Sequence, residues 1–129
     1  MGKSEDEIEV KKKYLQLYKE FSVTISAMEE LLVLIQKDSE NLKKLDKNLI
    51  ANKQVETMTK EIENSIIKKY DTCREILKAI DKIEDETERT LLIFKYINGN
   101  TWENICEKMS YSLRQVYNIH NKALKNVHL

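Results

Sequence analysis

Residues 110–127 of this chain read SYSLRQVYNIHNKALKNV, which has the pattern of a capped amphipathic helix. Ser112, with Gln115 three residues later, is a capping box, in which each side chain bonds the other residue's backbone N–H at the start of a helix. Apolar residues then recur at helical spacing, at Val116, Ile119, Ala123, Leu124 and Val127. The sequence therefore predicts a helix over about 112–126, with one apolar face and one face of amides and cations.

The polar face of this predicted helix carries residue types that read DNA bases. In the major groove, arginine bonds guanine through two hydrogen bonds, and asparagine or glutamine does the same with adenine. Tyr117 adds a ring for a thymine methyl or a phosphate, and the Ser112 hydroxyl at the helix start suits a phosphate. Lys122 and Lys125 lie further along and better suit phosphate contacts. We predict base contacts from Arg114, Gln115, Asn118 and Asn121.

Two shorter helices are predicted before it. Asp85 with Glu88 forms a capping box that opens one helix, and Asn98-Gly99 ends it. Its apolar residues are Leu91, Leu92, Phe94 and Ile97. Thr101 caps the next helix, WENICEKM, over residues 102–109. A short helix, a turn of three or four residues and a longer helix have the spacing of a helix-turn-helix motif.

The stretch 88–127 resembles region four of bacterial sigma factors. That region has an E-R-x-x-L helix, a turn, a short helix and a recognition helix that ends in x-x-A-L-x-x-L. The matching positions are Glu88-Arg89, Leu92, Ile105, Met109, Ser112, Val116, Ile119, Ala123-Leu124 and Val127. Leu113 departs from the pattern, because sigma factors usually have a basic residue there. A complete sigma factor is not expected, since we find no segment that resembles the promoter-melting region.

A narrower resemblance is to small transcription regulators of phages and mobile elements, similar in style to the RinA- and ArpU-like late-gene regulators. The matching residues are Thr101-Trp102-Glu103, Tyr111-Ser112, His120 and Ala123-Leu124. This resemblance implies sequence-specific binding to double-stranded DNA and control of transcription. Thr101 and Tyr111 join the predicted DNA-binding residues on this basis.

The first part of the chain shows a heptad repeat, which indicates coiled-coil packing. One series runs Tyr14, Phe21, Met28, Ile35, Leu42 and Leu49, and a second runs Leu17, Thr24, Leu31, Asp38 and Leu45. After a predicted turn at 47–54, a second helix carries Val55, Ile62, Ile66, Cys73, Ile76, Ile80 and Ile83. Two antiparallel helices are the simplest arrangement, either within one chain or between chains. For an oligomer or partner interface we predict Tyr14, Leu17, Phe21, Met28, Leu31, Ile35 and Leu42.

These patterns predict an all-α protein in two parts. Residues 1–84 form a long helical hairpin arm for dimerisation or partner binding, and residues 85–129 form a three-helix DNA-binding domain. The sequence has 129 residues, no proline and two glycines, which favours helix almost throughout. Two cysteines in separate segments do not make a disulfide framework, so a cytoplasmic protein is expected. No apolar run approaches the roughly 20 residues of a membrane span.

Several other functions find no support in the sequence. His120 has no histidine or cysteine partner at metal-ligand spacing, and no nucleophilic triad or glycine-rich phosphate loop is present, so neither an enzyme nor a metal or other cofactor is expected. A homodimer is expected, with RNA polymerase or another host protein as a further partner. The net charge is zero, which leaves a second hypothesis open. In that case the arm of a non-enzymatic interaction module binds and modulates a host protein, without DNA.

Overall fold

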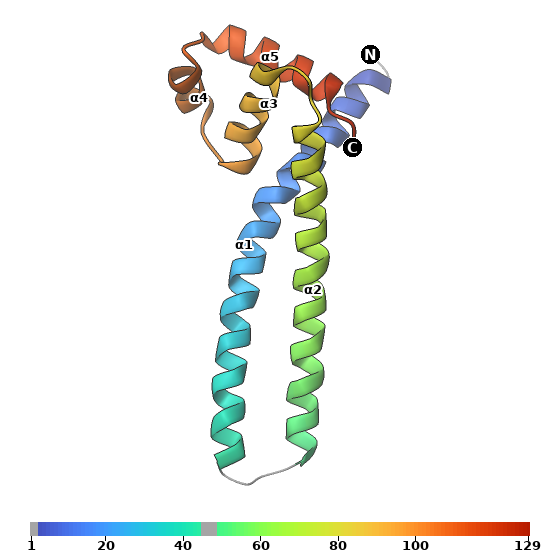
Figure 1. The fold of residues 1–129 in the computed structure, drawn as a ribbon, viewed down its shortest axis with the longest axis vertical. Coiled ribbons are helices and arrows are strands. Elements are labelled where there is room, and N and C mark those ends of the chain that lie inside the picture. The colour runs from blue at the N-terminus through green and yellow to red at the C-terminus, as the bar shows by residue number, and fades with distance from the viewer. Residues whose placement is uncertain (1–2, 45–48) are drawn as a thin grey trace. The chain divides into compact units, whose positions relative to one another are not determined.

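No proline interrupts the chain, so long helices can form without a break in their hydrogen bonds. The computed structural model describes residues 3–44 and 49–129, with side chains for residues 5–41 and 53–129, and all its regular structure is helical (Figure 1). The elements are α1 (Lys3–Lys44), α2 (Leu49–Asp81), α3 (Glu86–Leu92), the π-helix η1 (Ile93–Ile97), α4 (Trp102–Met109) and α5 (Leu113–Asn126). The predicted all-α class, with long helices followed by a smaller helical domain, is confirmed. Within the described residues, no helix combines the length and apolarity that crossing a membrane requires.

The chain divides into two compact units. The core unit consists of Met1–Glu20 and Thr72–Leu129, and the hairpin unit consists of Phe21–Asp71. The first turns of α1 therefore pack with the C-terminal helices, although they lie far apart in the sequence. The predicted boundary between a helical arm and a DNA-binding domain, at residues 84 and 85, stays a prediction.

In the hairpin unit, a segment of α1 and a segment of α2 lie side by side and antiparallel (Figure 1). Its buried or half-buried apolar residues are Phe21, Ile25, Met28, Leu32 and Ile35 from α1 and Val55, Ile62 and Ile66 from α2. The Tyr70 hydroxyl donates a hydrogen bond of 2.9 Å to Glu29 Oε1 across the pair. The two helices thus form their seam within one chain, which settles the arrangement that the sequence left open.

The seam of α1 contains the first of the two predicted heptad series, but its second series lies one residue later in the chain than predicted. Leu31 is 43% exposed and Asp38 is also exposed, whereas Ile25 is only 4% exposed and Leu32 is half-buried. In a heptad, the core positions are spaced alternately by three residues and by four. Phe21 and its heptad equivalents occupy the d positions. The next core residue, at an a position, therefore follows each of them after four residues rather than three. The prediction that Leu31 and Asp38 lie in the seam is wrong, because both side chains are exposed.

The break between the two long helices falls earlier than predicted. The helix α1 ends at Lys44 and α2 begins at Leu49, so residues 49–54 of the predicted turn are helical. Residues 45–48, including the heptad position Leu45, lie outside the described residues. The side chains of Leu42 and Leu49 also lie outside the described part, so nothing tests their predicted contacts.

The core unit is built around one apolar cluster drawn from every helix. Its fully buried members include Leu15 of α1, Ile76 of α2, Leu91 of α3, Ile105 of α4 and Val116 of α5. Ile8, Tyr14, Leu17 and Tyr18 from α1 pack against it as half-buried residues. Removing this apolar surface from water is the main force that holds the short C-terminal helices together, because helices of seven or eight residues are not stable alone.

The predicted capping box at the start of α3 forms only in part. The Asp85 side chain accepts a 2.9 Å hydrogen bond from the Glu88 backbone N–H, as expected for an N-cap. Glu88 does not complete the box. Its Oε1 instead accepts a 2.7 Å hydrogen bond from Asn126 Nδ2 at the end of α5. The carboxylate that the sequence assigned to a local cap therefore ties α3 to α5.

The helix predicted to run to Ile97 changes its winding before it ends. Residues Ile93–Ile97 form a π-helix, and the Asn98 backbone N–H donates to the carbonyl oxygen of Ile93, five residues earlier, at 2.9 Å. Gly99 follows with a φ of +71°, a conformation that glycine adopts without steric cost. The predicted end at Asn98-Gly99 is confirmed. The wider turn carries Tyr96, which is 4% exposed and faces α5.

Candidate nucleic-acid interface

The helices α4 and α5 are joined by a turn of three residues, as the spacing predicted. Thr101 caps α4 by accepting a 3.2 Å hydrogen bond from the Asn104 backbone N–H. The helix ends at Met109, and its C-cap residue Ser110 has a φ of 58° in the left-handed region. A left-handed residue after the last turn satisfies free carbonyls and redirects the chain, so Ser112, the N-cap of α5, follows only two residues later.

The start of α5 forms the complete capping box that the sequence predicted. The Gln115 backbone N–H donates to Ser112 Oγ at 3.2 Å, and the Ser112 backbone N–H donates to Gln115 Oε1 at 2.8 Å. A bidentate contact with adenine needs both the carbonyl oxygen and the amide nitrogen of a glutamine. Because the cap occupies Oε1, Gln115 can read adenine in that way only by giving up this hydrogen bond.

The buried face of α5 holds a histidine within an aromatic cluster. His120 is 4% exposed, its Nε2 lies 2.7 Å from the Tyr96 hydroxyl, and the Trp102 ring meets it edge-on at 4.9 Å between centroids. Burial, together with the charges of Lys12 and Lys95, lowers the pKa of His120 to about 4. Burial and the charge of Glu9 raise the pKa of Tyr96 to about 12. At neutral pH both groups are therefore uncharged, and His120 packs inside the aromatic cluster.

The predicted DNA-binding residues are all exposed. They are Thr101, Tyr111, Ser112, Arg114, Gln115, Tyr117, Asn118, Asn121, Lys122 and Lys125. On α5 the spacing of Arg114, Asn118, Asn121 and Lys125, at i, i+4, i+7 and i+11, places them on one face of a helix with 3.6 residues per turn. This face lies opposite the buried face of α5, which holds Val116, His120, Ala123 and Leu124. We call these four exposed residues the polar face.

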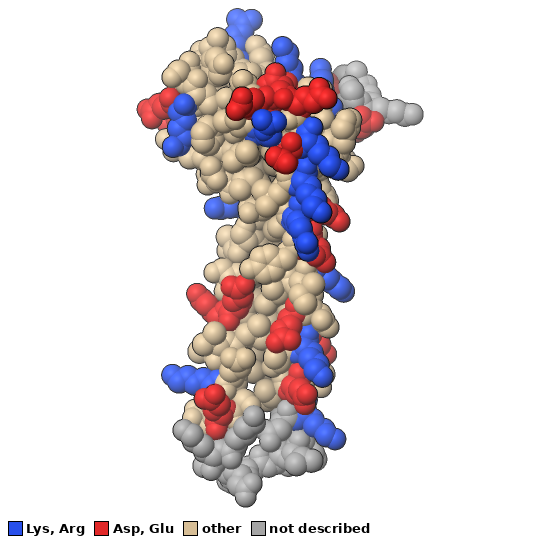
Figure 2. Space-filling view, viewed as in Figure 1, with Lys and Arg blue, Asp and Glu red and all other residues tan. Residues whose placement is uncertain are grey.

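One flank of the polar face is acidic. A hollow of about 350 Å³ lies between the start of α3 and α5, and its lining includes Asp85, Glu88, Gln115, Asn118 and Lys122. Figure 2 shows acidic side chains gathered over the start of α3, which carries Glu86 and Glu88 in its first turn. Carboxylates repel phosphates, so this flank opposes a nucleic-acid backbone. Lys122, which lines the hollow, is placed to offset this negative charge.

The opposite flank is aromatic and apolar. Tyr117 is 42% exposed and meets the Trp102 ring edge-on, with 5.1 Å between centroids. Lys95 Nζ lies 4.4 Å from the centroid of the same Trp102 ring, a cation–π contact. Leu113, one turn before Tyr117, is 47% exposed. Lys95 belongs to η1 and was missed by the sequence analysis, because no helical pattern connects it to α4 or α5.

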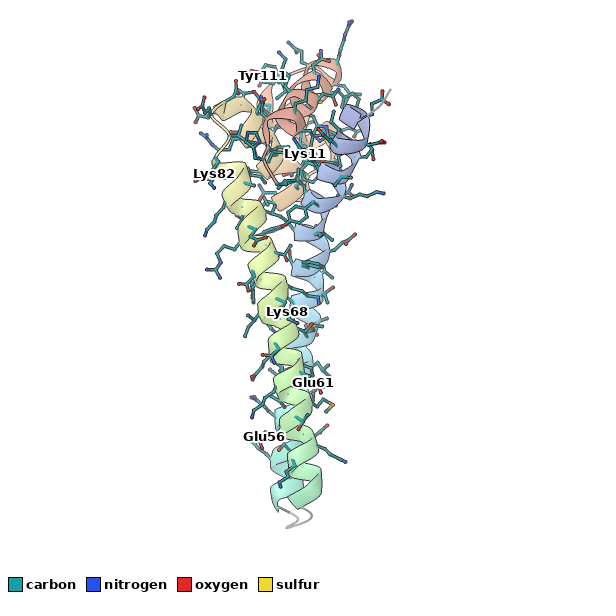
Figure 3. All side chains as sticks on the ribbon, turned by 90° about the vertical axis from the view of Figure 1, so that its right-hand side faces the viewer. Lys11, Glu56, Glu61, Lys68, Lys82 and Tyr111 are labelled. Carbon is teal, nitrogen blue, oxygen red and sulfur yellow. The ribbon has the colours of Figure 1, made fainter. Side chains whose placement is uncertain are left out.

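The far end of α5 is fixed from α1. Lys11 Nζ donates to the carbonyl oxygens of Leu124 and Lys125 at 3.0 and 3.3 Å, and Figure 3 shows Lys11 where α1 meets α5. A cation at a helix C-terminus also interacts favourably with the helix dipole. The sequence analysis missed this role because Lys11 lies more than 110 positions before its partners. With the Ser112 cap at one end and Lys11 at the other, α5 is held at both ends.

The site has no metal-binding geometry. Among the residues searched, which are those the structure describes, no three His, Cys, Asp or Glu side chains gather closely enough to hold a metal ion. Cys73 and Cys106 are both free thiols, and Cys106 packs against the core beside Ile105.

No curated protein and no solved structure gave a significant match to this chain. A family model does match, and it spans residues 43–128. This range contains the whole of α2 and every helix of the candidate interface, and it covers two thirds of the 129 residues. The chain therefore belongs to the family described as "Protein of unknown function (DUF1492)".

Proposed function

We propose that this protein is a sequence-specific DNA-binding regulator of transcription, of phage or mobile-element origin. In this proposal α4 and α5 act as a helix-turn-helix, and α5 lies in the major groove as the recognition helix. The resemblance of residues 88–127 to sigma region four and to small phage regulators supports it. The geometry supports it too, because a short capped helix braces a longer one whose outer face is free.

The observation that carries the proposal is the polar face. Arg114, Asn118 and Asn121 are exposed on a helix that is capped at its start and held by Lys11 at its end. Base readout needs such rigidity, because each bidentate contact depends on a fixed direction of approach. Lys125 continues the same face and suits a phosphate. Asn118 and Asn121 lie on the side of α5 opposite its buried residues, so their amides point away from the core.

A single copy carries few cations for DNA, so we propose that two copies act together. Two linked modules bind a double site far more tightly than one module binds a half-site. The hairpin unit has a surface for such pairing, because residues 21–36 read FSVTISAMEELLVLIQ and contain only two charges. Val23, Leu31 and Leu34 are 62%, 43% and 60% exposed, on the sides of α1 that α2 leaves uncovered. In Figure 2 the uncharged surface of this unit runs along its middle, with acidic and basic side chains on both sides.

The polar face gives the direct test of DNA binding. After selection of a preferred site from random DNA, Arg114→Ala and Asn118→Ala should each weaken binding to that site by about 1–3 kcal/mol and relax specificity at one position. Lys125→Ala should weaken binding to all sequences about equally and reduce the salt slope by about one. Fluorescence anisotropy at several salt concentrations measures both effects. Asn64→Ala, an exposed asparagine of the hairpin unit, is the matched control. Unchanged discrimination in both polar-face variants would exclude α5 as the recognition helix.

The uncovered apolar surface of α1 gives a second test. We expect the wild-type chain to be a dimer by light scattering and the double variant Val23→Glu with Leu34→Glu to be a monomer. Two carboxylates at an apolar interface lose their hydration without gaining partners, which opposes association. Thr57→Glu, at an exposed position of α2, is the control and should leave the mass unchanged. A monomeric wild type at tens of micromolar concentration would contradict pairing through α1.

The same uncovered surface favours one alternative function, in which the hairpin unit binds and modulates a host protein, such as RNA polymerase, and the chain does not bind DNA. Salt distinguishes the two functions. DNA affinity falls steeply with salt, because each neutralised phosphate releases counterions. An apolar helix–helix contact does not fall in this way. Retention of a host partner at high salt, with no DNA binding at low salt, would favour the interaction module.

A further inference from the structure

We infer that Leu113, together with Tyr117, reads thymine methyl groups, so that thymine is a specificity determinant of the DNA site. This inference rests on the proposed function, since it names what one flank of α5 contacts. Its starting point is an exposed apolar side chain at the start of the proposed recognition helix. Leu113 is the first residue of α5, and it leaves 47% of a large apolar side chain exposed at the end of the helix.

Leu113 and Tyr117 form one apolar surface. They lie four residues apart, so they are neighbours on the same side of α5. The Tyr117 ring is held by the edge-on contact with Trp102, and Trp102 in turn lies under Lys95. This surface borders the polar face on the side away from the acidic hollow. It therefore lies on the flank of α5 where DNA meets no carboxylate of α3.

In the major groove, the base group that suits contact with this apolar surface is the thymine methyl. Each base edge there offers hydrogen-bond donors and acceptors, and the thymine C5-methyl is its apolar group. A leucine has neither donor nor acceptor, so it cannot distinguish guanine, cytosine or adenine by hydrogen bonding. Contact with a methyl removes apolar area of both groups from water, which stabilises the complex. Residues at the start of a recognition helix are those that reach base edges.

The position of Leu113 also predicts where the thymine lies. Arg114 is its neighbour in the chain, and Asn118 is the neighbour of Tyr117. The apolar surface and the polar face therefore reach adjacent base pairs. We expect a thymine next to the guanine or adenine that Arg114 or Asn118 reads.

The test removes only the methyl group. The full-length protein first selects a preferred site from random DNA, and each thymine of that site is then replaced singly by deoxyuridine, which lacks the C5-methyl. In the wild type we expect one or two positions at which this change lowers affinity about threefold to fivefold, which is the change in affinity expected from burying one methyl group. In Leu113→Ala the same replacement should change affinity by less than about twofold, whereas Leu113→Met, which keeps apolar volume, should retain the dependence.

The outcomes separate this inference from the proposed function. If the wild type prefers a site but no deoxyuridine changes its affinity, the inference is overturned and the DNA-binding proposal stands. If the deoxyuridine effect persists unchanged in both Leu113→Ala and Tyr117→Ala, other residues read the methyl and the inference is again overturned. If the wild type prefers no DNA sequence at any salt concentration, the proposed function fails and the inference fails with it.

Discussion

Replacing Leu15 by alanine is expected to lower the free energy of unfolding of the core unit by about 2–5 kcal/mol. Leu15 has no exposed surface and belongs to the same apolar cluster as Ile105 and Val116 of the candidate interface. The substitution removes apolar contacts and leaves a cavity where α1 packs against the C-terminal helices. Urea unfolding followed by the fluorescence of Trp102, the single tryptophan, measures this unit directly.

The neighbouring residue provides the control. Gln16 is exposed on the next position of α1, so Gln16→Ala should change the free energy of unfolding by less than about 0.5 kcal/mol. The comparison tests whether α1 completes the core of the unit that presents α5. A loss below about 0.5 kcal/mol for Leu15→Ala would show that the C-terminal helices hold together without α1. In that case α1 would serve only the hairpin unit.

The stability of the core unit is expected to fall by up to about 3 kcal/mol between pH 7 and pH 4 because of His120 alone. Burial and the charges of Lys12 and Lys95 lower the pKa of His120 to about 4, from an ordinary value of 6.5. Below pH 6.5 the unfolded chain binds a proton at this histidine while the folded chain does not. Stability is therefore constant above this window, is lost as the pH falls through it, and levels off below about pH 4.

Two histidine variants isolate this effect from the titration of carboxylates. His120→Gln retains an amide that can bond the Tyr96 hydroxyl, which lies 2.7 Å from Nε2, but it has no group that titrates. The difference in unfolding free energy between wild type and this variant should change by about 3 kcal/mol across the window. His128→Gln, at an exposed histidine, should keep the full wild-type dependence. Equal pH slopes in wild type and His120→Gln would show that His120 takes up its proton in the folded state.

Local structure in this chain follows closely from local sequence. The caps at Asp85, Thr101 and Ser112 begin helices as predicted, because a side-chain oxygen and the N–H three residues later are set by the chain itself. The end at Asn98-Gly99 and the apolar face of α5 were equally readable. Each of these features depends on residues within one or two helical turns.

The errors came where a pattern has two solutions that differ only in packing. The series Phe21, Met28 and Ile35 fits either the a or the d positions of a heptad, and only the partner helix selects which. The same holds for Glu88, whose side chain can bond the local N–H or Asn126, and the structure contains the second contact. Sequence spacing cannot rank such alternatives, since both satisfy it.

By itself the sequence determined the all-helical class, the starts and ends of the short helices and the set of exposed polar residues on α5. These depend on helical periodicity and on caps, which act over a few residues. Only the tertiary structure decided that Lys11 holds the end of α5 and that Leu15 completes the apolar core against which α5 packs. It also decided that acidic residues at the start of α3 border one flank of the polar face. Those contacts join positions far apart in the chain, and the burial of apolar surface that brings them together carries no local signature.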